Sequence, residues 1–347
     1  MTQYELTRAE QVKCGIKWLA SVVCGITGAF HLARWSTKPS VTIIAYHRIV
    51  DDSYAGIRPY ISVKKSRLRK QLRFFRKYYR VISLEEAVDR LSSDRVDQHY
   101  LVITFDDGYA DNYSIGLDLF RDEGIKPTVF VTTDCVEKQQ ALWPDVVRAL
   151  IYNADVSRPL ELDEPRLVIT SASASKVRAL RSILEYLKKM DPRERTRYLT
   201  ALEKRIGRAL PTTERLMLTW EEIKCLKRYG VSIGSHTVSH QVLAEVPDGV
   251  AAAELRASKQ ILEARIGSPV TLFAYPNGTA ADFSEATVQH VKAAGYTAAV
   301  TTMRGINGSG SDLYRLRRTG VYLTDTVSVI KLKLVAESFI KAGMSPQ

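Results

Sequence analysis

The stretch YLVITFDDGY, residues 100–109, decides how the fold is read from this sequence. Its first four residues are apolar, which is typical of a strand buried on both faces of a sheet. The strand runs into two adjacent carboxylates, Asp106 and Asp107, with no Lys or Arg beside them. An isolated Asp-Asp-Gly is usually a plain turn. The pair therefore has to be interpreted together with the rest of the chain.

Similar apolar runs, each followed by a helical pattern, recur along the sequence. They lie at residues 41–46, 124–133, 231–236, 270–276, 296–302 and 316–322. Strands that alternate with helices predict an α/β protein, with a parallel sheet wrapped by helices and either open or closed into a barrel. Residues 139–217 break the alternation with long helical patterns and several prolines. We expect a helical insertion there, within a domain of residues 41–325 that is followed by a C-terminal helix or tail at 326–347.

The charge of the chain is concentrated in one segment. The net charge is +12, and residues 62–80 carry nine basic side chains and no acid. Leu68, Leu72, Phe75 and Tyr79 follow the spacing of an amphipathic helix. This helix either packs on the core with a solvated basic face or lies near anionic lipid or an acidic glycan. No nucleic-acid-binding motif accompanies the charge.

The N-terminal segment, residues 1–38, contains the apolar run WLASVVCGITGAFHLA at 18–33. It is shorter than the roughly 20 residues that span a bilayer. We expect an apolar helix that anchors at a membrane interface, with a helix packed on the protein's own core as the alternative. The chain is therefore expected to be membrane-associated in a bacterium, on a side of the membrane that the sequence does not indicate. The four cysteines have no metal-binding or disulfide-framework spacing.

A second motif, GSHTVSH at residues 234–240, follows a predicted strand. A helical turn beginning at Ser235 would project His236 and His240 from one face, at a spacing that one metal ion can bridge. Two histidines and one carboxylate form a common catalytic metal set that leaves room for water and substrate. TFDDG supplies this carboxylate and a second one that can accept a proton from water.

TFDDG together with SHTVSH resembles the polysaccharide deacetylase family, carbohydrate esterase family 4, over residues 41–322. The resemblance implies an irregular (β/α) barrel of about seven strands. It implies that Asp106 is the general base and that Asp107, His236 and His240 bind one divalent ion. Zn²⁺ is favoured, with Ni, Co or Fe as alternatives.

The sequence departs from the family pattern at two places. In FAYPNG, residues 273–278, Ala274 stands where many members have an arginine that orients the base, and YRLRRTGV at 314–321 lacks the usual histidine. AYHRI at 45–49 is similar to a branch that includes exopolysaccharide poly-N-acetylglucosamine deacetylases. We therefore expect His47 to be the general acid, or else a supporting histidine. Arg318 is the expected partner of Asp106, and Arg317 is the alternative.

The same resemblance implies that the backbone N–H of Asn277 helps to hold an oxyanion. Tyr109, Trp143 and Tyr275 are candidates for substrate binding, although tyrosine and tryptophan are as often core residues. The expected function is metal-dependent removal of N-acetyl groups from amino sugars of a polysaccharide or oligosaccharide. The alternatives are an O-acetyl esterase on glycans and a catalytically silent glycan-binding or scaffold protein. The expected partners are an N-acetylated glycan and an anionic membrane surface, but not nucleic acid; the oligomeric state is not indicated.

Overall fold

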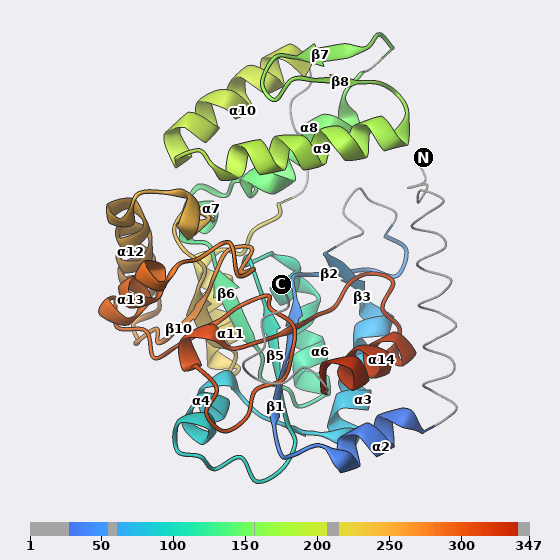
Figure 1. Cartoon of the computed structure of the whole chain (residues 1–347), viewed down its shortest axis with the longest axis vertical. Coiled ribbons are helices and arrows are strands. Elements are labelled where there is room, and N and C mark those ends of the chain that lie inside the picture. The colour runs from blue at the N-terminus through green and yellow to red at the C-terminus, as the bar shows by residue number, and fades with distance from the viewer. Residues whose placement is uncertain (1–27, 55–60, 156, 207–214, 339–347) are drawn as a thin grey trace.

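A computed structural model describes residues 28–54, 61–155, 157–206 and 215–338 of the 347-residue chain (Figure 1). The predicted N-terminal anchor lies mostly outside these residues. Among the residues described, no helix combines the length and the apolarity needed to cross a bilayer. Cys135 and Cys225 are free thiols. Cys14 and Cys24 also lie outside the described part.

The core is a parallel sheet whose main path runs in the order β11-β10-β9-β6-β5-β1-β12. Its strands are β1 Val41–Tyr46, β5 Tyr100–Phe105, β6 Thr128–Val131, β9 Ser232–Ser235, β10 Leu272–Ala274, β11 Ala298–Val300 and β12 Thr319–Gly320. Short β4 (Arg80–Val81) pairs with the start of β5. Leu316 bridges to Val300 in β11 before the chain continues into β12, which pairs with β1. The sheet therefore curls round on itself, and the predicted irregular (β/α) barrel of about seven strands is confirmed.

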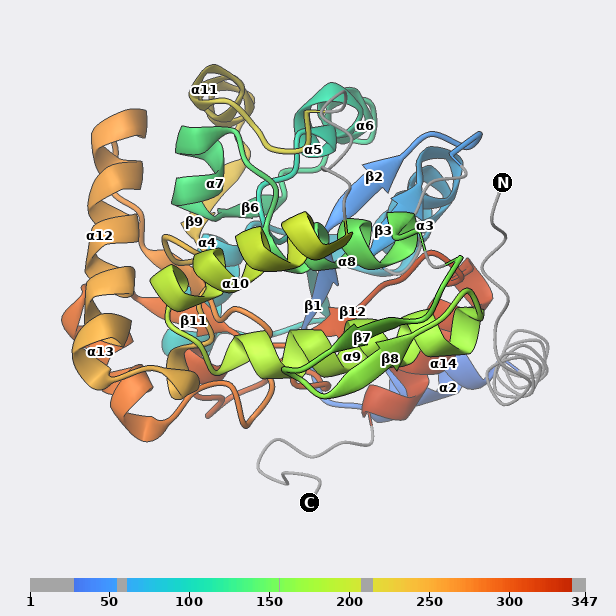
Figure 2. The ribbon, with the colours of Figure 1, turned by 90° about the horizontal axis from the view of Figure 1, so that it is seen from above.

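Helices cover the outside of the sheet (Figures 1 and 2). They are α3 Lys65–Tyr78, α4 Leu84–Ser92, α5 Asp111–Ser114, α6 Gly116–Asp122, α7 Thr133–Lys138, α11 Trp220–Arg228, α12 Asp248–Ile266 and α13 Glu285–Ala293. Short 3₁₀ turns occur at η1 Leu243–Glu245 and η2 Leu313–Arg315, and β2 Arg48–Val50 pairs with β3 Ser62–Lys64. The sequence explains several helix starts: Ser83 caps α4, and Thr219 with Glu222 forms a capping box at α11.

The basic segment forms α3, as its spacing predicts. Leu68, Leu72 and Phe75 are fully buried, whereas Arg73, Arg76 and other basic side chains point outward. Burying this apolar stripe is what holds the helix on the barrel. The structure thus confirms the amphipathic helix packed on the core.

Residues 143–206 form a separate layer of helices and one hairpin. Its elements are α8 Trp143–Asn153, β7 Leu160–Leu162, β8 Leu167–Ile169, α9 Ser173–Lys188 and α10 Pro192–Ile206. They share an apolar cluster of their own, which includes Val147, Leu150 and Ile183. Figure 1 shows this layer at one end of the molecule, toward which β1 points, and α2 Ala29–Ser36 with α14 Val327–Ser338 at the other.

Candidate active site

The polar residues of the two motifs meet at the carboxyl ends of neighbouring strands. Tyr46 of β1 pairs with Phe105 of β5, so His47 and Asp106 leave the sheet side by side. β6 lies between β5 and β9, and Val131 of β6 pairs with Ser235, the residue before His236. Catalytic residues of α/β barrels gather at this edge of the sheet. The insertion lies beyond the same edge (Figures 1 and 2).

Asp107, His236 and His240 form a compact buried cluster. Oδ1 of Asp107 lies 3.3 Å from Nε2 of His236 and 3.4 Å from Nε2 of His240, and the three ligand atoms lie within 4.8 Å of one another. Ligands about 2.0–2.2 Å from a tetrahedral ion are themselves about 3.3 Å apart. Within the described part of the chain, Oδ1 is buried and accepts no hydrogen bond. The residues present therefore fit a divalent metal ion.

The electrostatics of this cluster favour an anionic carboxylate and a defined imidazole tautomer. Burial alone would raise the pKa of Asp107, but the adjoining His236 and His240 hold that pKa well below its usual range. Nδ1 of His236 lies 2.7 Å from the backbone oxygen of Ala274. This carbonyl can only accept a hydrogen bond, so Nδ1 carries a proton and the ring presents Nε2 to Asp107.

The loop that carries the two histidines differs from the expected helical turn. Residues 236–242 have no regular structure, and both Thr237 (φ 66°) and His240 (φ 55°) are left-handed. The carboxylate of Glu254 on α12 accepts hydrogen bonds from the N–H groups of Val238 (2.8 Å) and Ser239 (3.0 Å). The expectation of a helical turn was wrong because these fixed loop contacts, and not i,i+4 geometry, bring the imidazoles together.

Asp106 is held by a fully buried arginine. Nη1 and Nη2 of Arg318 donate to the two carboxylate oxygens of Asp106, each at 2.7 Å. Nε of the same guanidinium donates to the backbone oxygen of Thr301 at 2.7 Å. Burial alone would raise the pKa of Asp106, but the charge and hydrogen bonds of Arg318 hold it below its ordinary value. Asp106 is therefore ionised and fixed in orientation.

The structure brings Arg318, and not Arg317, to Asp106. The side chain of Arg317 donates instead to the backbone oxygen of Arg304, at 3.0 Å, on the outside of the barrel. Successive residues of an extended segment point to opposite faces, so only one of two neighbouring arginines can enter the site.

His47 lies beside the two carboxylates. Its charge contributes to the lowered pKa of both Asp106 and Asp107, after burial and the closer partners of each. Its backbone oxygen accepts a hydrogen bond from Nδ2 of Asn112 at 2.9 Å. Within the described residues, Nδ1 of His47 is buried and has no hydrogen-bond partner. The imidazole therefore lies next to the two carboxylates, and its Nδ1 forms no hydrogen bond with another described residue.

Asn277 occupies a left-handed turn after Pro276, with φ 59°. The amide N–H of Asn277 donates to no protein acceptor within the described residues. An unused N–H at the edge of the sheet is the kind of donor that an oxyanion requires. The next residue, Gly278, also has a positive φ of 67°, and a Cβ there would lie 2.9 Å from the N of Thr302.

The three aromatic candidates for substrate binding are all buried. Tyr275 is 1% exposed, stacks on Phe283 at 4.2 Å and donates to the backbone oxygen of Tyr314. Tyr109 is also 1% exposed, and its hydroxyl donates to Asp145 at 2.7 Å. A sugar ring cannot stack on a covered face, so the geometry corrects these two assignments toward the core alternative.

Trp143 also has a structural contact in place of an open face. Its indole N–H donates to the backbone oxygen of His240 at 3.2 Å, and the guanidinium of Arg195 lies 4.6 Å from its ring centre. Arg195, on α10, is 3% exposed and also donates to the side chain of Gln241. The insertion therefore holds the segment that carries His240.

Sequence reasoning missed the residues that support the site from behind. Asp111 accepts from Nε of Arg48 and from the N–H of Ile49, both at 2.8 Å, which fixes the chain just after His47. Glu254 and Arg195 do the same for the histidine loop. Only Asp111 had a local signal, since a polar Asp-Asn pair follows the motif directly; the others contact partners far away in the sequence.

Backbone strain also concentrates at this site. Six non-glycine residues among those described have a positive φ: Asp94, Asp107, Gln139, Thr237, His240 and Asn277. Four of the six belong to the two motifs or to the turn at Asn277. Such conformations cost about 1–3 kcal/mol each and persist where surrounding contacts hold a functional geometry.

A model of the polysaccharide deacetylase family matches residues 93–156 and 169–299, which together make up more than half of the chain. The chain belongs to the polysaccharide deacetylase family. A curated relative, YxkH of Bacillus subtilis (strain 168), carries the name of a polysaccharide deacetylase and is 22% identical over 244 residues. The match covers 70% of this chain and only 59% of that relative's length.

Solved structures share the deacetylase fold. The Streptococcus pyogenes deacetylase PplD, in complex with acetate, matches with a TM-score of 0.57 and 19% identity, over 86% of this chain and 99% of its own. IcaB from Ammonifex degensii gives a TM-score of 0.54 and 17% identity, over 87% of this chain and 98% of its own. A de-N-acetylase from Aggregatibacter actinomycetemcomitans gives a TM-score of 0.55 and 16% identity, over 85% of this chain and 99% of its own. At these identities the likeness supports the fold.

Proposed function

We propose that this chain is a divalent-metal-dependent hydrolase that removes N-acetyl groups from amino sugars of a polysaccharide or oligosaccharide. The observation that carries the proposal is the metal-ligand cluster of Asp107, His236 and His240 next to a second, ionised carboxylate, Asp106. The ligand set suits Zn²⁺. A divalent ion held there supplies Lewis-acid polarisation of a carbonyl and lowers the pKa of a water.

Asp106 is the general base of the proposed reaction. It is ionised, it is oriented by Arg318, and it is not part of the ligand cluster. A base of this kind takes the proton of the attacking water as the water adds to the acetamide carbon. Arg318 keeps the carboxylate in place and makes it a weaker base than an isolated buried carboxylate would be. The division of roles between two adjacent acids follows from their different partners.

His47 and Asn277 complete the proposed reaction. Asn277 offers its backbone N–H to the carbonyl oxygen of the acetamide, which gains negative charge as water adds. His47 delivers a proton to the amide nitrogen as the C–N bond breaks, since nitrogen is a far better leaving group when it is protonated. The products are acetate and a free amino sugar. Atoms balance, because one water supplies both the hydroxyl of the acid and the proton of the amine.

The names of similar proteins favour an amide over an ester as the bond that is cleaved. The Aggregatibacter protein is described as a de-N-acetylase, and PplD was solved with acetate, which would be the product of this reaction. Both statements concern those proteins. For this chain they support the choice of N-acetylated glycans as the first substrates to test.

The test is acetate release from N-acetylglucosamine oligomers, measured beside O-acetylated glycans of the same length. We expect release from the N-acetylated series, its loss on treatment with a chelator and its return on adding Zn²⁺. The Asp107→Asn variant should bind the ion much more weakly and release little acetate. Release from O-acetylated glycans alone would assign an esterase. Stoichiometric glycan binding without release from either series would show a silent glycan-binding protein.

A further inference from the structure

Helix α2 presents an apolar face to solvent at the end of the molecule opposite the site. Trp35 is 88% exposed and Leu32 is 63% exposed, one helical turn apart. These are the two most exposed large apolar side chains among the residues described. Tryptophan at this exposure is costly in water and is enriched where a protein meets a bilayer interface. We therefore expect Trp35 and Leu32 to contact a binding partner.

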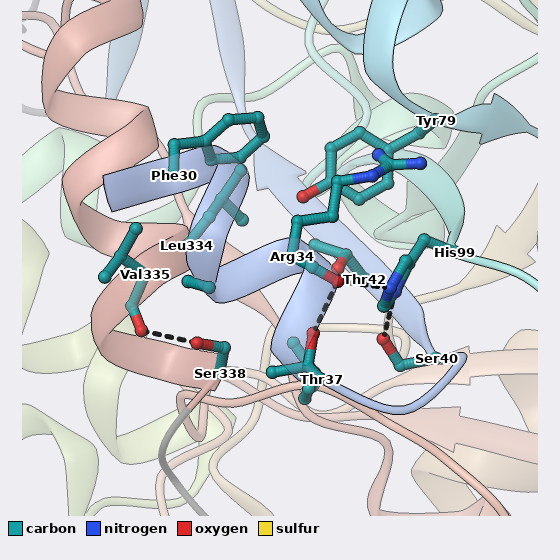
Figure 3. A pocket seen from close by; sticks show the side chains of 12 residues that line it. Phe30, Arg34, Thr37, Ser40, Thr42, Tyr79, His99, Leu334, Val335 and Ser338 are labelled. Carbon is teal, nitrogen blue, oxygen red and sulfur yellow. Dashed lines mark hydrogen bonds between the residues drawn. The ribbon is translucent and has the colours of Figure 1, made fainter. Parts of the chain in front are cut away.

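The opposite face of α2 fixes the helix to the barrel. Phe30 is 3% exposed and packs on the rings of Phe74 (5.3 Å) and Tyr78 (5.4 Å) of α3. Arg34 lies over the ring of Tyr79, with its guanidinium carbon 4.7 Å from the ring centre, as Figure 3 shows. The hollow drawn in Figure 3 has room for little more than a water molecule, about 20 Å³, so it is not a ligand site. Because Phe30 and Arg34 pack α2 against the barrel, Trp35 and Leu32 on its other face point outward.

Two lysines lie beside the aromatic rings on which α2 packs. Nζ of Lys77 lies 5.4 Å from the ring of Tyr78, and Nζ of Lys331 lies 5.7 Å from the ring of Phe74, and both rings contact Phe30. Within the described residues, neither lysine forms an ion pair with a carboxylate. Glu337 on α14 is fully buried and contacts Thr319 and Arg304. Unneutralised positive charge beside the helix that exposes Trp35 and Leu32 fits an anionic lipid surface.

The sequence that directly precedes α2 is uncharged and mostly apolar. Residues 18–27, WLASVVCGIT, contain no charged side chain. The chain thus runs directly from an uncharged apolar stretch into a helix that shows Leu32 and Trp35 to solvent. Lys38 follows α2 and is exposed. Apolar residues bounded by basic ones are typical of segments that lie in a membrane interface.

We propose that the α2 face, defined as Leu32 and Trp35, docks on an anionic lipid bilayer, with Lys77 of α3 and Lys331 of α14 supplying positive charge beside the helix. α2 precedes β1, and His47 follows β1, so the site and the docking face lie at opposite ends of a six-residue strand. At about 3.3 Å per residue, the strand separates them by about 20 Å. The active site therefore opens away from the lipid. If the proposed function holds, the substrate is a glycan approached from the aqueous side.

The test uses the full chain and vesicles of phosphatidylcholine with or without 30% phosphatidylglycerol (about one lipid in three). Binding is measured by co-sedimentation. We expect tighter binding to the anionic vesicles and about tenfold weaker binding for Trp35→Ser or Leu32→Ser, since each loses an apolar side chain from the interface. Lys77→Gln and Lys331→Gln should each weaken binding about fivefold on anionic vesicles and leave binding to neutral vesicles unchanged.

Matched controls lie on the insertion at the other end of the molecule. Val168, which is 51% exposed on β8, is replaced by Ser, and Lys204 on α10 is replaced by Gln; neither change should affect binding. Every variant retains residues 18–27, so differences among variants report on the α2 face. Lipids with brominated acyl chains should quench wild-type fluorescence more than that of Trp35→Phe, which isolates the signal of Trp35.

Three results would overturn the proposal. Vesicle binding by Trp35→Ser and Leu32→Ser at the wild-type level would show that other residues bind the lipid. Equal binding to neutral and anionic vesicles would exclude an electrostatic contribution to lipid binding. Sedimentation showing a dimer that Trp35→Ser dissociates, without lipid binding at this face, would make a second copy of the chain its partner. None of these readouts uses deacetylase activity, so they stand apart from the proposed function.

Discussion

Replacing Arg318 by methionine removes the counterion of Asp106 without changing the size of the side chain much. The guanidinium is fully buried and donates to both oxygens of Asp106, to the Thr301 carbonyl and to the Thr104 hydroxyl. Arg318→Met leaves the carboxylate buried without its hydrogen-bonding counterion. Removing one member of a buried pair costs about 3–5 kcal/mol. The free energy of unfolding should fall by that amount.

A double-variant cycle separates the ion pair from simple loss of packing. Asp106→Asn leaves a buried arginine without its full partner, whereas Asp106→Asn with Arg318→Met leaves no buried charge. The loss in the double variant should therefore be smaller than the sum of the single losses by about 2–3 kcal/mol. Arg317→Met is the matched control, because the Arg317 side chain donates to the Arg304 carbonyl at the barrel surface and not to Asp106. It should change stability by less than about 0.5 kcal/mol.

Urea unfolding followed by circular dichroism, with chelator present throughout, measures these differences without a contribution from ion binding. The pH dependence has a defined sign. The lowered pKa of Asp106 means that its ion pair stabilises the fold above about pH 4, the unfolded value, and that this contribution is lost as pH falls through the lower folded value. The stability gap between wild type and Arg318→Met should narrow below about pH 4. Additive losses in the cycle, within about 0.5 kcal/mol, would refute the coupling.

Three further predictions concern the proton donor, the histidine loop and the turn at Asn277. His47→Gln should lower the rate of acetate release from N-acetylated oligomers at least about 100-fold in a kinetic assay. The same variant should hydrolyse an activated aryl acetate at nearly the wild-type rate, because the aryl oxide leaving group needs no proton. Equal losses on both substrates would contradict the role of His47 as proton donor. Trp143→Phe, which removes the hydrogen bond to the His240 carbonyl, should weaken metal binding about tenfold in competition with a chromophoric chelator, and unchanged affinity would mean that the contact does not position the ligand. Gly278→Ala should lower the thermal midpoint, since a Cβ would lie 2.9 Å from a backbone nitrogen at φ 67°, whereas Gly249→Ala, in open space on α12, should not lower it.

The sheet and the two motifs could be predicted because their signals are local. Buried parallel strands are apolar along their whole length, and the acids and histidines directly follow such strands in the sequence. Residues that follow strands of one parallel sheet meet at the same edge, so the cluster of Asp107, His236 and His240 could be expected without coordinates. Its distances could not, because the left-handed loop at Thr237 and His240 depends on Glu254.

Contacts between distant segments account for what the sequence left open. Arg317 and Arg318 are neighbours of identical type, and only the register of β12 against β1 determines which one faces Asp106. Trp143 and Tyr109 are residues that suit either a sugar or a core. Trp143 belongs to the insertion and packs against Arg195, and Tyr109 donates to Asp145 of the insertion. The contact of Arg195 with Gln241, 46 residues apart, leaves no trace in either local sequence. Sequence periodicity carries no information on such pairings.

The division of labour between Asp106 and Asp107 is the central claim, and the Asp106→Asn variant tests it most directly. Metal content and acetate release from N-acetylglucosamine oligomers should be measured on the same preparation, beside the wild type. We predict one divalent ion per chain, bound as tightly as in the wild type, and acetate release reduced by about 10²–10⁴-fold. Acetate release near the wild-type rate, with the ion in place, would contradict the assignment of Asp106 as the base.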